Sequence, residues 1–111
     1  MDIETKLESK LESIFPNLGI RAEAIEILNS YGSESHEQEP TRIRLAILKL
    51  IGQEPSIAKL KEFTNTAKSD YRDVLAWAEY PRQSEHWSAT ASEKLELAKA
   101  DLDEYRTWLN T

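Results

Sequence analysis

The sequence predicts an all-α protein, built as a single domain of five helices over residues 1–111. Three observations lead to this prediction. Glycine and proline are rare, with three and four residues among 111, which favours a few long elements. Apolar residues recur at helical spacing in five segments, and no segment shows the alternation that is typical of a strand. Glycine or proline separates the five segments, and the length fits one domain.

The two N-terminal helices are expected over about residues 2–14 and 18–31. The apolar residues of the first follow a stripe one residue wide, at Ile3, Leu7, Leu11 and Ile14. Such a narrow stripe buries little surface, so we expect this helix to dock on the rest of the chain or on a partner. The second helix has a broader apolar face, and Gly32 after it fits a left-handed C-cap.

A third helix is expected over about residues 41–51, after a polar segment. Pro40 suits the first helical position if the helix starts late, whereas Ser35 and Gln38 have the spacing of a capping box for an earlier start. Leu45 and Leu48 widen its apolar face beyond half of the circumference. We therefore predict that this is the most buried helix.

The segment 56–80 contains no glycine or proline, and its apolar residues recur at steps of three, four or seven. We predict one continuous helix of roughly 37 Å, long for a chain of this size, around which the fold is organised. The last helix is expected over about residues 90–109, with Thr90 and Glu93 at capping-box spacing. Its inward seam is predicted at Ala91, Leu95, Ala98, Leu102, Tyr105 and Leu109.

The two long C-terminal helices are joined by a short predicted loop. We expect them to pack antiparallel as a hairpin, with a crossing angle of roughly 20°. The three shorter helices would cover the open face of this hairpin.

The net charge is −6, and residues 1–40 hold nine acidic and three basic groups. This acidic third disfavours binding to nucleic acid or to anionic membranes. A nucleic-acid accessory role that uses Arg42, Arg44 and Lys49 is kept as a weaker alternative. The absence of cysteine excludes disulfides and thiolate chemistry. With no signal peptide and no apolar run of membrane-spanning length, the expected location is cytoplasmic.

No catalytic motif is found, and the sequence implies no cofactor and favours a non-enzymatic function. His36 and His86 each stand beside carboxylates, so an interhelical pocket for a metal ion or a small ligand would form if their loops met. No His-x-His or His-Glu-x-x-His spacing supports a metal site, and solvated loop histidines are the simpler interpretation. The paired acids around Asp70 and Asp101 are interpreted as surface ion pairs.

Aromatic residues gather in the last third of the chain, at Trp77, Tyr80, Trp87, Tyr105 and Trp108. Around Tyr80, Arg82, His86 and Trp87 they are interleaved with charged residues, a composition that is enriched at protein interfaces. The structural alternative is that Trp77 and Trp108 pack in the core while Tyr80 and Trp87 clamp the hairpin turn.

Two segments, TRIRLAILKL at 41–50 and DYRDVLAWAEYP at 70–81, resemble parts of small uncharacterised bacterial proteins. This resemblance covers the middle third to half of the chain. It implies a bacterial, cytoplasmic and all-helical protein, and it implies no activity.

The sequence therefore predicts a small helical protein-protein interaction module. Its partner would be another protein or a second copy of the chain. Two candidate surfaces follow: the stripe Ile3, Leu7 and Leu11, and the tip formed by Tyr80, Arg82, His86 and Trp87. The alternative is a protein or enzyme that binds a metal or a small ligand through His36, His86 and nearby carboxylates.

Overall fold

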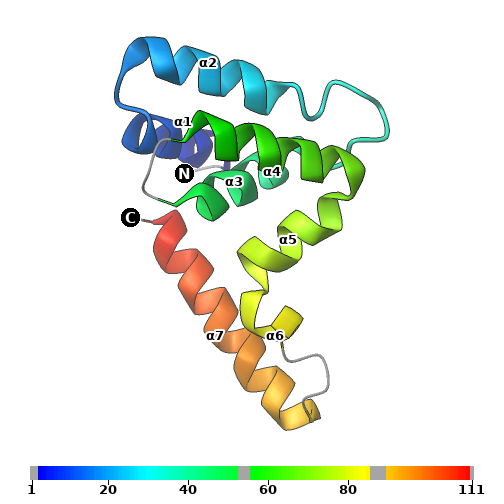
Figure 1. Cartoon of the computed structure of the whole chain (residues 1–111). Coiled ribbons are helices and arrows are strands. Elements are labelled where there is room, and N and C mark those ends of the chain that lie inside the picture. Colours follow the sequence, from blue (N-terminus) through cyan, green and yellow to red (C-terminus); the bar gives the residue numbers. More distant parts are fainter. Residues whose placement is uncertain (1–2, 53–55, 86–89, 111) are drawn as a thin grey trace.

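A computed structural model of the protein describes residues 3–52, 56–85 and 90–110, which form seven α-helices and no strand. The helices are α1 (Ile3–Ile14), α2 (Leu18–Asn29), α3 (Pro40–Ile51), α4 (Ile57–Ser69), α5 (Tyr71–Glu79), α6 (Pro81–Glu85) and α7 (Ala91–Leu109) (Figure 1). The all-α prediction is confirmed for these residues. The predicted first, second, third and last helices correspond to α1, α2, α3 and α7, whereas the number and arrangement of the helices differ from the prediction.

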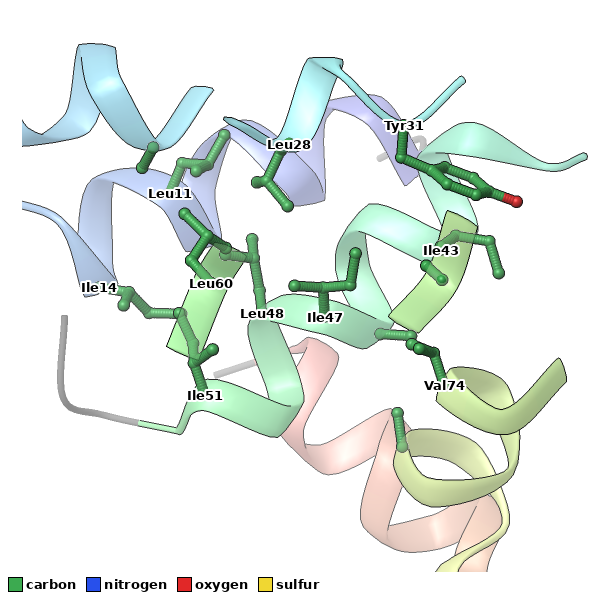
Figure 2. Packing of buried hydrophobic residues seen from close by; sticks show 14 of the residues in the cluster. Leu11, Ile14, Leu28, Tyr31, Ile43, Ile47, Leu48, Ile51, Leu60 and Val74 are labelled. Carbon is green, nitrogen blue, oxygen red and sulfur yellow. The ribbon is translucent and has the colours of Figure 1, made fainter. Parts of the chain in front are cut away.

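Helix α3 lies at the centre of the fold and contacts α1, α4 and α5. It contains more buried residues than any other described helix: Ile43, Leu45, Ala46, Ile47, Leu48 and Ile51. Figure 2 shows apolar side chains from the neighbouring helices meeting around it. Because apolar residues cover most of its circumference, packing on several sides removes the most apolar surface from water. The predicted burial of this helix is confirmed. The two helices of the segment 56–80, α4 and α5, contact α3 and also reach α2, α6 and α7.

The segment 56–80, predicted as one helix, is instead divided into α4 and α5 at Asp70. The backbone of Asp70 is extended, with φ −157° and ψ 101°. Its N–H donates to the carbonyl of Thr66 (2.8 Å) and closes α4, while its carboxylate accepts from the N–H of Arg72 (3.0 Å) and caps α5. With 12 residues, α3 is only about 18 Å long. The break lets both α4 and α5 contact α3, so tertiary packing outweighs the propensity for one long helix.

The predicted hairpin of two long helices is also replaced by a different arrangement. Pro81 begins the short helix α6 inside the segment that we expected to be a loop. Helix α7 packs mainly on α6 and α5 and has no comparable contact with α4. In Figure 1, α7 starts beside α6, far from α1–α4, and runs back towards them. None of the described helices is long and apolar enough to cross a membrane.

The N-terminal helices α1 and α2 cover the core from one side. Leu11 and Ile14 of α1 and Ala24 and Leu28 of α2 are buried. The side chain of Asn17 accepts a hydrogen bond from the N–H of Ile20 (3.1 Å) and caps α2. The narrow stripe of α1 thus docks on the rest of the chain, which is one of the two possibilities that the sequence predicted.

The connection from α2 to α3 is held by polar contacts. The Tyr31 hydroxyl donates to the carbonyl of Gln38 (2.9 Å), and Tyr31 is buried. The buried Glu37 carboxylate accepts from the N–H groups of Gly32 (3.1 Å) and Glu34 (2.9 Å). Gly32 has φ +98°, a conformation that a side chain disfavours. Helix α3 then begins at Pro40, so the later of the two predicted starts is correct.

Candidate protein-interaction surfaces

Asp101 joins α6 to α7 and is the buried residue of α7, with 1% exposure. One carboxylate oxygen accepts from the N–H (3.2 Å) and the Nη1 (3.1 Å) of Arg82, and the other from the N–H (3.2 Å) and the Nε2 (3.4 Å) of Gln83. The two backbone donors belong to the first turn of α6, where they have no intrahelical acceptor. Asp101 therefore caps α6 from a neighbouring helix.

This role differs from the surface ion pair that the sequence suggested for Asp101. Arg82 also pairs with Glu104 (2.8 Å), and the hydrogen bonds to Asp101 and Glu104 raise the pKa of its guanidinium. The sequence favours a surface ion pair for this carboxylate because it lies beside the apolar stripe of its helix with basic residues nearby, and exposed pairs of this kind are common. Its partners Arg82 and Gln83 lie 19 and 18 residues earlier in the sequence. The spacing of residues within α7 therefore did not indicate them.

The predicted tip is described only in part, because His86 and Trp87 lie outside the described residues. Tyr80 is 41% exposed, and its hydroxyl accepts from Arg42 (3.2 Å). Arg42 itself forms a two-bond ion pair with Glu79 (2.7 and 2.9 Å). Tyr80 and Arg82 thus have intramolecular partners, and their role in an interface stays a prediction.

The predicted stripe of α1 is divided between the core and the surface. Leu11 is buried, Leu7 is partly buried against the core, and Ile3 is 43% exposed. The stripe therefore attaches α1 to the protein, and Ile3 is the residue of the three that is exposed to solvent.

The C-terminal end of α7 is fixed against α1. The ammonium of Lys10 lies 4.6 Å from the centre of the Trp108 ring, a cation–π contact, and Lys6 donates to the side chain of Asn110. The Tyr105 ring lies 5.8 Å from that of Trp108, and burial raises the pKa of Tyr105 to about 12. Trp108 packs against the core, as the structural alternative proposed, whereas Trp77 is 45% exposed.

The first half of α7 carries an apolar strip, which we call the α7 seam: Ala91, Leu95, Ala98 and Leu102. Ala98 is partly buried, and the other three are exposed. Leu95 is 74% exposed and Leu102 is 47% exposed. A shallow groove of about 390 Å³ runs along it, and the charged side chains of Glu96 and Lys99 border this groove. The sequence predicted the seam correctly as an apolar stripe but assigned it to the inside of the protein.

The contacts of α7 explain why the helix is oriented with the seam on the outside. A second stripe has the same steps of four and three and consists of Leu97, Asp101, Glu104 and Trp108. Asp101 is buried, Leu97 and Trp108 are partly buried, and Glu104 is exposed. This second stripe is less apolar, but Asp101 and Glu104 bind Arg82. Trp108 packs against the core at the same time. This second stripe was the signal in the sequence that could have indicated the correct face.

A polar pocket of about 340 Å³ lies where α4 meets α5. It is lined by Tyr31, His36, Glu37, Ala67, Lys68, Ser69, Asp70, Tyr71 and Arg72. The backbone hydrogen bond from Glu34 lowers the pKa of Glu37, and the bond from Arg72 lowers that of Asp70. His36 is exposed, and in the described parts of the chain no three histidine or acidic residues are grouped as a metal site. His86 lies outside the described residues, so the predicted approach of His36 and His86 stays a prediction.

The chain matches no protein-family model, no curated protein and no solved structure.

Proposed function

We propose that this chain is a small helical protein-interaction module that binds its partner through the α7 seam. The observation that supports this proposal is the exposure of Leu95 and Leu102 on one face of a helix that is anchored elsewhere by Asp101 and Trp108. Among the described residues, no other helix packs over Leu95. The helix is therefore held in place while its most regular apolar stripe faces water.

The composition of the seam is that of a helix-docking surface. Apolar residues at steps of four and three are the anchors by which one helix packs on another. Burying a leucine side chain contributes about 1.5–3 kcal/mol, which makes Leu95 the strongest contributor to a complex. Glu96 and Lys99 give the apolar strip a charged border, as is common at the rim of protein interfaces.

The experiment compares Leu95→Glu with Leu18→Glu in complex formation. Leu18 lies on α2 and is 75% exposed, so it matches the exposure of Leu95 but lies outside the seam. Complexes are measured by sedimentation of the pure protein and by affinity capture from a cell lysate. We expect Leu95→Glu to remove a complex that both wild type and Leu18→Glu form, with equal melting temperatures for all three. If every complex survives Leu95→Glu, the proposal is wrong.

A second candidate function is supported by the polar pocket at the junction of α4 and α5. His36 and Glu37 line it together with the cationic side chains of Lys68 and Arg72. Arg72 already pairs with Asp70 of the same pocket (3.0 Å), so the carboxylate or phosphate of a small polar ligand would face Lys68. His36 is one of the two histidines around which the sequence suggested a ligand pocket.

A thermal-shift experiment with inorganic phosphate, citrate and divalent metal salts tests this second function. Binding at the pocket predicts a rise in melting temperature that His36→Ala and Lys68→Ala reduce and that Leu95→Glu leaves unchanged. Equal shifts in wild type and His36→Ala would exclude His36 as a ligand-binding residue.

A further inference from the structure

We infer that the partner of the α7 seam is a second copy of the same chain, bound in the antiparallel direction about a two-fold axis between Glu96 and Leu97. This inference rests on the proposed function and specifies its partner. It is carried by the sizes of the seam residues, by the charges beside them and by the position of α7 in the protein.

The seam alternates large and small residues in an order that fits itself when reversed. Leu95 and Leu102 are the large residues, and Ala91 and Ala98 are the small ones. In the antiparallel pair, Leu95 lies opposite Ala98 of the second copy, and Ala91 lies opposite Leu102. Every layer then contains one leucine and one alanine, so the distance between the two helix axes is similar in all layers. A parallel pair would place leucine against leucine and alanine against alanine, with uneven layers.

The charges beside the seam also favour the antiparallel direction. Lys94 and Lys99 flank the seam on opposite sides, at the positions that approach each other across a parallel helix pair. A parallel dimer would therefore contain two lysine–lysine contacts. In the antiparallel pair, Lys99 comes within about 3 Å, measured along the axis, of the level of Glu96 of the second copy. Both residues border the same groove, so the two-fold axis creates two complementary pairs.

The position of α7 leaves room for this arrangement. Its first half extends beside α6, away from α1–α4, which lie towards its C-terminal end (Figure 1). An antiparallel pair places the two sets of α1–α4 at opposite ends of the dimer. A C2 interface requires such a self-complementary patch, and the seam satisfies this requirement in size and in charge.

The seam is short, so the dimer belongs to the weak class of interfaces, which bury less than about 1,200 Å² in total. Sedimentation equilibrium of the full chain from about 10 μM to about 1 mM covers the dissociation constants expected of this class. Leu95 is present twice in a symmetric dimer, so Leu95→Glu should raise the dissociation constant about 100-fold or more. Leu18→Glu should leave it unchanged.

The direction of pairing is measured by electron paramagnetic resonance between nitroxide labels. The chain has no cysteine, so Lys99→Cys and Arg106→Cys each give one labelling site. The two sites are one heptad apart on the same edge of α7. In the antiparallel dimer the labels are separated along the helix axis by about 8 Å at position 99 and by about 28 Å at position 106. A parallel dimer gives equal distances at both positions and overturns the inference.

The outcomes separate this inference from the proposed function. A dimer that Leu95→Glu dissociates, with unequal label distances, supports both. A chain that stays monomeric at the highest concentration overturns the second copy as partner, while a captured protein lost only in Leu95→Glu would keep the proposed function. A dimer that is insensitive to Leu95→Glu overturns the inference. If the lysate also yields no complex that this variant loses, the proposed function fails as well.

Discussion

The region around α3 and the region around α7 are stabilised by different interactions. Around α3, aliphatic side chains from five helices exclude water, and α3 is anchored by its apolar residues. Helix α7 has one buried residue, the carboxylate of Asp101, and is anchored by polar contacts at its middle and a cation–π contact near its end. Its leucines at 95 and 102 remain exposed. The comparison indicates that α3 stabilises the fold, whereas α7 is positioned by specific polar contacts that leave its apolar face free to bind.

The largest expected effect is a contrast between two truncations, Ile47→Ala in α3 and Leu95→Ala in α7. Ile47 is fully buried, so its truncation leaves a cavity and should cost about 2–5 kcal/mol of the free energy of unfolding. Leu95 is 74% exposed, and its truncation should change the free energy by less than about 0.5 kcal/mol in dilute, monomeric protein. Urea denaturation measures both values. Similar losses in the two variants would show that α7 packs inward on its seam after all.

A smaller effect is expected from Asp101→Ala, which removes the connection between α6 and α7. The N–H groups of Arg82 and Gln83 lose their acceptor, and a buried donor without a partner costs about 1–3 kcal/mol. Because α7 packs mainly on α6 and α5, we expect the loss to be local. Hydrogen exchange should accelerate at the amides of residues 82 and 83 and along α7, while the amides of α3 keep their protection.

The matched control for this prediction is Asp103→Ala. Asp103 is exposed on the same helix, and its side chain should be replaceable without loss of protection. Uniform acceleration across α3 and α7 in Asp101→Ala would contradict the separation of the two regions.

Helices α1, α2, α3 and α7 could be predicted from the sequence, because helical periodicity and end signals are local properties. Thr90 accepts from the N–H of Glu93 at the start of α7, as the capping-box spacing indicated. Pro40 occupies the first turn of α3, which is one of the two starts that the local pattern left open. The division of α4 and α5 at Asp70 had a local signal too, since Asp70 and Asp73 have the spacing of a cap and a third helical residue. The segment 56–80 contains no glycine or proline, and this favoured the prediction of one continuous helix over a break at Asp70.

The orientation of α7 could not be predicted in the same way. Two stripes with the same spacing lie side by side on this helix, and hydrophobicity alone selects the wrong one. The stripe that faces inward contains Asp101, whose burial depends on donors from Arg82 and Gln83 on another helix. The sequence therefore identified the residues of the candidate binding surface, but it did not show that they are exposed to solvent. The predicted tip at Tyr80 and Arg82 was selected by composition, which does not show that their side chains already have partners in the fold.

The smallest predicted effect concerns Glu37, which supports the entry to α3 by a buried carboxylate as Asp101 supports α6. Hydrogen bonds from Glu34 and Gly32 lower the pKa of Glu37 below the ordinary value of 4.5. A lowered pKa in the folded state means that the stabilisation is fully present above about pH 4.5 and is lost as the pH falls through the folded-state pKa. In Glu37→Gln this contribution is absent at every pH. The free energy of unfolding, measured from about pH 7 to about pH 3, should therefore fall less steeply below pH 4.5 in Glu37→Gln than in wild type.

The control for this prediction is Glu34→Gln. The side chain of Glu34 is exposed, and the variant should follow the wild-type curve. Identical slopes for wild type and Glu37→Gln would show that this carboxylate does not hold the loop before α3, which would then depend on its other contacts, such as the hydrogen bond from Tyr31 to Gln38.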